Sequence, residues 1–272
     1  MTESNRAMRE TADDRIRLEV RDLEVVLGRG VRATRVLNGV SFSIPVGTTV
    51  GLVGESGSGK STIAKTIVGV HQPSGGSIRF DGEEIGELRG SRPAALRRRI
   101  QLIPQDPYSS LDPRRTIGQT LAEALDPRGA SVRRHRDRIS ELLRLVAPDD
   151  SAIDRYPREF SGGQRQRIAI ARALAVEPEL VIADEITSAL DLSTQAEILE
   201  LFERLRRELS LTVLFVSHNL AVVRQVSDEV LVLLHGDLVE VGSAERVLSA
   251  PEHEYTRRLV ASVPGGSGFS LD

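Results

Sequence analysis

The sequence lacks several features that would each indicate a class of protein. It contains no cysteine, which excludes disulfide bonds, thiolate zinc sites, iron–sulfur clusters and cysteine nucleophiles. It has no run of about 18 apolar residues, so no segment is expected to span a bilayer. Residues 1–15 lack the apolar core of a signal peptide and are expected to form a flexible tail. We therefore expect a soluble chain that reaches a membrane only through a partner.

The net charge is small, and lysine is rare. The formal net charge of −3 gives no argument for a nucleic-acid-binding surface. Almost all the basic residues are arginine, and lysine occurs only at positions 60 and 65. A lysine at position 60 is therefore conspicuous in a chain that otherwise uses arginine.

Lys60 lies in a glycine-rich stretch that fits the pattern G-x-x-x-x-G-K-[ST] of phosphate loops. An apolar run at 49–53 predicts a buried strand before it, and 62–68 predicts a helix after it, which is the context that the motif needs. Glycines let the backbone N–H groups turn inward around an anion, and the helix adds the positive end of its dipole. Lys60 is expected to reach the β- and γ-phosphates and the Ser61 hydroxyl to bind Mg²⁺. The candidate nucleotide-binding residues are Gly54, Glu55, Ser56, Gly57, Ser58, Gly59, Lys60, Ser61 and Thr62.

The remaining pattern predicts an α/β fold. Alternating apolar and polar residues at 16–27 and 35–44 predict an antiparallel β layer. Continuous apolar runs at 180–183 and 212–217 predict strands buried on both faces, as in a parallel sheet. The segment 106–158, which precedes these two runs, is rich in helical patterns and predicts an inserted helical subdomain. The other expected helices are 117–125, 131–146, 192–209, 220–226, 244–249 and 255–262.

Two further stretches have the chemistry of a phosphate site. Asp184 and Glu185 follow a buried strand, where an aspartate can hold Mg²⁺ and the next carboxylate can polarise a water beside the γ-phosphate. Ser161-Gly162-Gly163-Gln164 begins a strongly patterned helix, which predicts a helix cap and a second anion site. Two γ-phosphate sites and one phosphate loop leave two possibilities: the sites converge in one subunit, or two subunits exchange them.

In this order the motifs resemble those of the nucleotide-binding subunits of ABC transporters, over roughly residues 16–264. The resemblance assigns Gln105 to the Q-loop, Ser161–Gln164 to the signature motif, Asp184 to Walker B and Glu185 to the catalytic base. It implies a phosphate-loop (RecA-like) parallel sheet core with an antiparallel β subdomain and an inserted helical subdomain. The implied boundaries are flexible tails at 1–15 and 265–272, a β layer plus core at 16–105 and 176–235, a helical subdomain at 106–175, and a C-terminal extension at 236–264. The other assigned residues are Ser188–Asp191 as the D-loop, with Asp191 at the nucleotide, His218 as the switch histidine that contacts the γ-phosphate, and Gln105, Ser61 and Asp184 around Mg²⁺.

The family resemblance also implies cofactors and partners. ATP and Mg²⁺ are expected, with each ATP held between the phosphate loop of one subunit and the signature motif of another. The second ATPase is expected to be a related chain in a heterodimer, with a homodimer as the alternative. Integral membrane permease subunits, and indirectly a solute-binding protein, complete the expected assembly on the cytoplasmic face of the cell membrane.

Two stretches narrow the resemblance. Residues 104–114 are similar to the extended Q-loop of ATPases for oligopeptide, dipeptide and nickel importers, and 251–259 is similar to their tail motif. Some positions depart from the pattern. Leu27 stands where many relatives place an aromatic residue against adenine, Ile186 replaces a proline, and Glu254 replaces a proline in the tail.

The expected function is ATP hydrolysis that drives import of a peptide or a similar small solute. Three alternatives stay open at this point. They are the ATP-binding component of a phosphonate-cleaving (C–P lyase) assembly, a soluble ABC protein of DNA repair or translation, and a regulatory subunit that does not hydrolyse ATP. The balanced charge argues against a nucleic-acid partner, and the presence of Glu185 and His218 argues against an inactive subunit.

Overall fold

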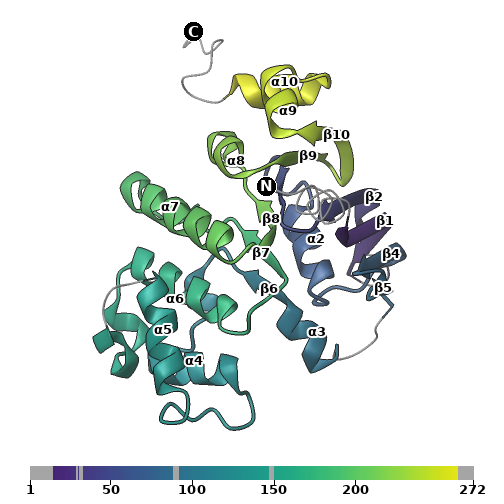
Figure 1. The fold of residues 1–272 in the computed structure, drawn as a ribbon. Coiled ribbons are helices and arrows are strands. Elements are labelled where there is room, and N and C mark those ends of the chain that lie inside the picture. Colours follow the sequence, from purple (N-terminus) through teal and green to yellow (C-terminus); the bar gives the residue numbers. More distant parts are fainter. Residues whose placement is uncertain (1–14, 29, 31–32, 88–91, 147–149, 263–272) are drawn as a thin grey trace, which may run out of the picture. The chain divides into compact units, whose positions relative to one another are not determined.

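The computed structural model describes residues 15–28, 30, 33–87, 92–146 and 150–262, and these form two compact units. The first unit runs up to Arg92 and resumes at Thr212, and the second unit is the continuous segment Pro93–Leu211. Parallel strands, a separate antiparallel sheet and a helical segment are all present, as the sequence predicts (Figure 1). The predicted fold class is thereby confirmed.

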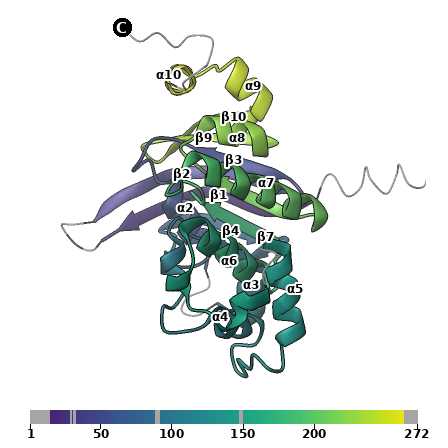
Figure 2. The same ribbon diagram turned by 90° about the vertical axis from the view of Figure 1, so that its left-hand side faces the viewer.

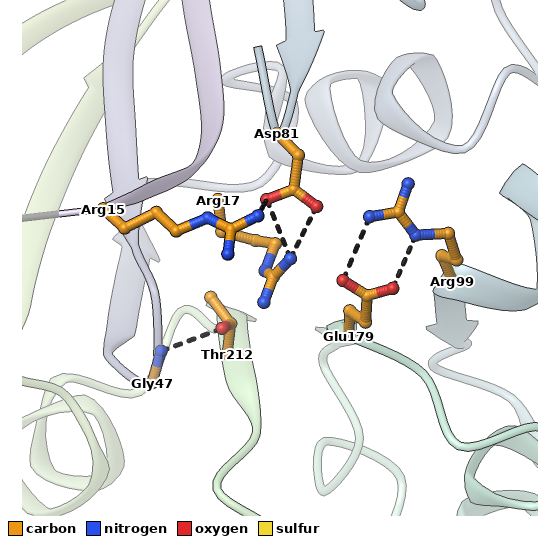
Figure 3. A network of polar contacts seen from close by, with 7 residues as sticks. All are labelled: Arg15, Arg17, Gly47, Asp81, Arg99, Glu179 and Thr212. Atoms are coloured by element: carbon orange, nitrogen blue, oxygen red, sulfur yellow. Dashed lines mark hydrogen bonds and ion pairs between the residues drawn. The ribbon is translucent and has the colours of Figure 1, made fainter. Parts of the chain in front are cut away.

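An antiparallel sheet opens the first unit. It contains β1 (Ile16–Leu27), β2 (Thr34–Pro45), β4 (Gly75–Phe80) and β5 (Glu83–Glu84), in the order β2-β1-β4-β5. Alternate residues of β1 are buried on each side of Asp22, where an irregularity in the pairing shifts the pattern by one residue. At the β4–β5 hairpin the Asp81 carboxylate accepts hydrogen bonds from Arg17 Nη1 at 2.6 and 2.8 Å (Figure 3). This contact joins strand β1 to the hairpin.

The remaining strands of the first unit pair mostly in parallel. Strand β3 (Thr49–Val53) lies between β8 (Thr212–Val216) and β9 (Glu229–Leu234), and β10 (Asp237–Ser243) pairs antiparallel with β9. Every residue of β3 and β8 is buried, which explains their uninterrupted apolar sequences. The Thr212 hydroxyl accepts the Gly47 N–H at 2.9 Å, just before β3 begins (Figure 3).

Four helices lie among the residues of this unit that the structure describes. They are α2 (Lys60–Ile67), α8 (Leu220–Val226), α9 (Ala244–Ser249) and α10 (Glu254–Ala261). Helix α2 begins two residues before the predicted start at Thr62, because Gly59 itself takes the N-cap position in a left-handed conformation. At its other end the Arg92 guanidinium donates to the carbonyls of Thr66 and Ile67.

The second unit is mostly helical. Its strands β6 (Ile100–Ile103) and β7 (Leu180–Asp184) are parallel, and an ion pair between Arg99 and Glu179 at 2.5 Å joins their beginnings (Figure 3). Figure 2 shows helices α4, α5 and α6 gathered together. The helices are α3 (Ala94–Arg99), α4 (Ile117–Leu125), α5 (Arg136–Val146), α6 (Gly162–Leu174) and α7 (Leu192–Glu208), with short 3₁₀ turns at Pro107–Ser109, Asp150–Asp154 and Pro157–Glu159.

The predicted helix at 131–146 is too long. Helix α5 begins at Arg136, and residues 131–135 form a turn in which the Ser131 hydroxyl accepts the Arg134 N–H at 3.3 Å. The polar side chains of this turn contact Asp126 instead of contributing to an apolar helix face. Without an apolar face, a few extra residues of helix gain little from packing.

Among the residues that the structure describes, no helix is both long and apolar enough to cross a membrane.

Candidate active site

The phosphate loop leaves strand β3 at Gly54 and enters helix α2 at Lys60. Gly54 has φ of 153°, and a Cβ atom there would lie 2.1 Å from the carbonyl oxygen of Leu233. Gly59 has φ of 112°, and a Cβ atom there would lie 2.9 Å from a Leu37 methyl carbon. Both positions therefore require glycine. The first and third glycines of the motif are needed for the backbone conformation and for close packing, whether or not a ligand is bound.

Lys60 is held inside this loop. Its side chain is 4% exposed, and Nζ donates to the carbonyl oxygens of Gly54 and Glu55 at 2.8 Å each. The Ser58 carbonyl accepts the N–H of Gly236 at 2.9 Å, so a second point of the loop is also fixed. Residues 55–57 are exposed, and residues 61–62 are half-buried. The loop thus presents a charged ammonium group and a helix N-terminus in a defined conformation, which suits a polyphosphate.

The second unit brings together three of its polar side chains. Strand β7 ends at the buried Asp184, and Glu185 follows with φ of 50°, in the left-handed region. Gln105 Nε2 donates to Glu185 Oε2 at 3.0 Å and to Ser188 Oγ at 3.1 Å. The Ser188 hydroxyl in turn donates to the Glu185 carbonyl at 3.0 Å. Gln105 and Glu185, which the sequence assigns to one reaction, are in contact.

Helix α6 begins at the predicted signature motif. The Ser161 hydroxyl accepts the Gln164 N–H at 3.3 Å, and the Gln164 side chain accepts the Ser161 N–H at 2.9 Å. This reciprocal pair is the capping box that the sequence predicts. Gly163 lies against helix α7, where a Cβ atom would come within 2.3 Å of Thr194 Cγ2. One glycine of the motif is therefore needed for helix packing.

Asp191 is the N-cap of helix α7. Its carboxylate accepts hydrogen bonds from the Ser193 hydroxyl at 2.6 Å and from the Thr194 N–H at 3.0 Å. The hydrogen bond from Ser193 has the largest effect and those from Thr194 come next, and together they lower the pKa of Asp191 to about 2. The side chain is therefore a permanent anion near neutral pH.

The structure also places two other assigned residues and one departure from the family pattern. His218 follows strand β8 and is exposed, and Leu27 ends strand β1 and is half-buried. Ile186, next to Glu185, is 1% exposed, so the residue that replaces the usual proline is part of the core. The roles of His218 and Leu27 at the nucleotide stay predictions.

The candidate metal ligands offer oxygen atoms. Among the described residues, no group of three or more His, Cys, Asp or Glu side chains could hold a metal ion by itself. Mg²⁺ is commonly bound by one or two carboxylates together with substrate phosphates and water. A hydroxyl on Ser61, the Asp184 carboxylate and the Gln105 amide oxygen fit this pattern, since the Gln105 amide nitrogen is already used toward Glu185 and Ser188.

Two contacts of these motifs could not be found from the sequence. Ser188 was assigned only as part of the D-loop, yet its hydroxyl contacts both Gln105 and Glu185. Tyr255 was noted only as part of the tail motif, yet its hydroxyl accepts the N–H of Glu55 in the phosphate loop. The tail motif marks Tyr255 as a residue of interest, but it does not indicate that the tyrosine contacts a residue 200 positions earlier in the chain.

Comparison with known proteins decides the family. The ABC transporter family matches residues 37–188, more than half of the chain. The chain belongs to the ABC transporter family. This ABC ATPase is 44% identical over 258 residues to the dipeptide transport ATP-binding protein DppF of Lactococcus lactis subsp. cremoris, a match that covers 93% of this chain and 83% of that protein. It is 41% identical over 266 residues to the oligopeptide transport ATP-binding protein OppF of Escherichia coli, covering 97% and 80%.

Solved structures agree with this assignment. The ATP-binding cassette MJ0796, solved as a dimer in a post-hydrolysis state with ADP and Pi, superposes with a TM-score of 0.75 at 30% identity, over 84% of this chain and 98% of that one. CbiO1 of Clostridium perfringens, part of the transporter complex cbiONQ, superposes with a TM-score of 0.76 at 27% identity, over 87% and 92%. The family and the ATPase activity expected from the sequence are confirmed.

Proposed function

We propose that this ABC ATPase hydrolyses ATP to drive the import of a peptide, or of a similar small solute, through membrane-embedded permease subunits. The observation that carries ATP hydrolysis is the contact between Gln105 and Glu185 at the end of buried strand β7, in a chain with an intact phosphate loop. The observation that carries peptide import is the similarity to DppF and OppF over almost the whole chain. The C–P lyase and nucleic-acid alternatives have no comparable observation in their favour.

The proposed roles follow from the chemistry of each group. Lys60 and the N–H groups at the start of helix α2 bind the β- and γ-phosphates. Ser61, Asp184 and Gln105 would hold Mg²⁺, which would supply positive charge beside the phosphate oxygens. Glu185 accepts a proton from the attacking water, and Gln105 orients the Glu185 carboxylate through their hydrogen bond. His218 contacts the γ-phosphate.

A second ATPase subunit is proposed to complete the site. Ser161 and Gln164 at the start of helix α6 are exposed, and they would bind the γ-phosphate of a nucleotide held by the partner's phosphate loop. The partner is either a related ATPase or a second copy of this chain. Contact with permease subunits would hold the assembly at the cytoplasmic face of the membrane.

The test is the variant Glu185→Gln, with Lys60→Ala beside it. Glutamine keeps the size of Glu185 and an oxygen that can accept from Gln105, but it cannot accept a proton from water. We expect ATP binding within about twofold of the wild type and hydrolysis reduced about 10²- to 10⁴-fold, the range for a lost general base. Lys60→Ala is expected to lose ATP affinity itself. Normal turnover by Glu185→Gln would refute the assigned base, and unchanged ATP binding by Lys60→Ala would refute the assigned phosphate site.

A further inference from the structure

Tyr255 connects the C-terminal end of the chain to the phosphate loop. It lies in the first turn of helix α10, and its side chain is 4% exposed. Its hydroxyl oxygen accepts the backbone N–H of Glu55 at 2.9 Å. Burial raises the pKa of Tyr255 above its ordinary value of 10.0, so the hydroxyl stays neutral at physiological pH.

The peptide group that Tyr255 contacts is also the one that holds Lys60. The Glu55 N–H and the Gly54 carbonyl belong to the same peptide plane, and the Gly54 carbonyl accepts from Lys60 Nζ at 2.8 Å. One end of this peptide is therefore bonded to tyrosine and the other to the lysine ammonium group. Gly54 has no Cβ to restrict rotation of the peptide, so these hydrogen bonds set its orientation.

Helix α10 is itself held in place by strand β10. The Glu240 carboxylate accepts the N–H groups of Glu252 and His253 at 2.9 and 3.0 Å, immediately before the helix. His253 Nδ1 accepts the Tyr255 N–H at 3.2 Å and caps the helix. Burial favours the neutral form of Glu240, but the backbone hydrogen bonds from Glu252 and His253 and the positive charge of Arg246 oppose it, and the pKa of Glu240 is lowered. The tyrosine thus approaches the loop from a support with its own fixed contacts.

We propose that Tyr255 is a positioning residue for nucleotide binding. Its hydroxyl fixes the Gly54–Glu55 peptide, and that peptide fixes Lys60 Nζ where the phosphates of a nucleoside triphosphate are bound. This inference rests on the proposed function of the loop and adds a role for the C-terminal segment. Without the hydroxyl, the peptide turns to find another partner for its N–H, and the conformation that binds ATP has to be recovered on binding.

The test is Tyr255→Phe in the full chain, with Tyr156→Phe as the matched control. Phenylalanine keeps the buried ring and removes only the hydroxyl, whereas Tyr156 lies in the second unit at the exposed N-cap of a 3₁₀ turn. Isothermal titration with ATP and Mg²⁺ is expected to show a Kd about three- to tenfold higher for Tyr255→Phe, the effect of one hydrogen bond. The KM for ATP rises by the same factor while kcat at saturating ATP stays within about twofold. Tyr156→Phe leaves both unchanged.

The outcomes separate the possible explanations. A lower melting temperature with unchanged Kd and KM would mean that the hydroxyl is only structural, and would overturn the inference. A fall in kcat at unchanged KM would overturn it as well. If Lys60→Ala also binds ATP as the wild type does, the proposed function fails. If Lys60→Ala loses ATP and Tyr255→Phe does not, only the role of Tyr255 fails.

Discussion

Arg92 offers a quantitative test of how the helix after the phosphate loop is stabilised. Its side chain is 7% exposed, and its guanidinium donates to the carbonyl oxygens of Ile67 and of Thr66, the latter at 3.2 Å. These are the last carbonyls of helix α2, where a positive charge also interacts favourably with the helix dipole. Burial lowers the pKa of Arg92, but an arginine remains charged. The substitution Arg92→Met removes the guanidinium group and keeps much of the aliphatic part of the arginine side chain.

The expected cost can be worked out from the bonds. Thr66 O also accepts the Gly69 N–H at 3.0 Å, so it keeps a partner, while Ile67 O loses the one described for it. A buried acceptor left unpaired costs about 1–3 kcal/mol, and the lost charge at the helix end about 0.3–1 kcal/mol. Arg92 Nε is buried without a partner among the described atoms, and its removal returns about 1 kcal/mol. The net destabilisation should be about 0.3–3 kcal/mol, centred on ~1.7 kcal/mol.

The assay is thermal unfolding followed by circular dichroism, because the chain has no tryptophan for fluorescence. A loss of about 1.7 kcal/mol, the centre of this range, corresponds to a fall in melting temperature of about 3–7 °C. The control is Arg224→Met, since Arg224 is exposed and no side-chain hydrogen bond or ion pair is described for it. Equal melting temperatures for the two variants, within about 1 °C, would refute the reasoning. ATP affinity should be unchanged, because Arg92 acts at the end of α2 away from the loop.

Two more predictions concern helix α7 in the second unit. Gly163→Ala places a methyl group 2.3 Å from Thr194 Cγ2, so we expect thermal unfolding to show a loss of about 1–3 kcal/mol in the free energy of unfolding. The double variant Gly163→Ala/Thr194→Ser removes the methyl group of Thr194 and should recover that stability. A double variant no more stable than Gly163→Ala would contradict this packing. Asp191→Ala should lower the melting temperature by an amount that is constant above pH 3.8, the ordinary pKa of an aspartate, and that shrinks as the pH falls toward about 2. The reason is that a carboxylate with a lowered pKa stabilises the fold fully above its ordinary pKa and loses this effect as it is protonated in the folded state. A difference in melting temperature that changes between about pH 5 and 8 would argue against the capping role.

Much of the fold was predictable because its signals are local. The continuous apolar runs at β3, β7 and β8 correspond to strands buried at every position, and the capping box at Ser161 and Gln164 needs only three residues of separation. The helix at 131–146 was predicted too long because basic residues are compatible with a helix in sequence but made other contacts here. A propensity is easily outweighed by such contacts.

The site was predictable only in part. The motifs predict site roles for Lys60, Gln105 and Glu185 because each residue lies beside a helix or strand with a clear apolar sequence pattern. The contacts between residues far apart in the chain have no such pattern: Ser188 with Gln105, and Tyr255 with Glu55, depend on how loops are brought together by the sheet. A motif can identify a residue type, but it cannot show which backbone group that residue will face.

The order of the strands also affects how the chain is made. Strand β3 pairs with β8 and β9, and both are synthesised after the whole second unit. At typical translation speeds the roughly 160 residues between β3 and β8 take about 8–30 s to emerge, and during that time a wholly apolar strand has none of the neighbours described for it. Tyr255 is made later still. Strand β3 and the phosphate loop that follows it are therefore among the first parts of the domain to leave the ribosome and among the last to reach their final form. This interval is when the nascent chain most needs protection from aggregation.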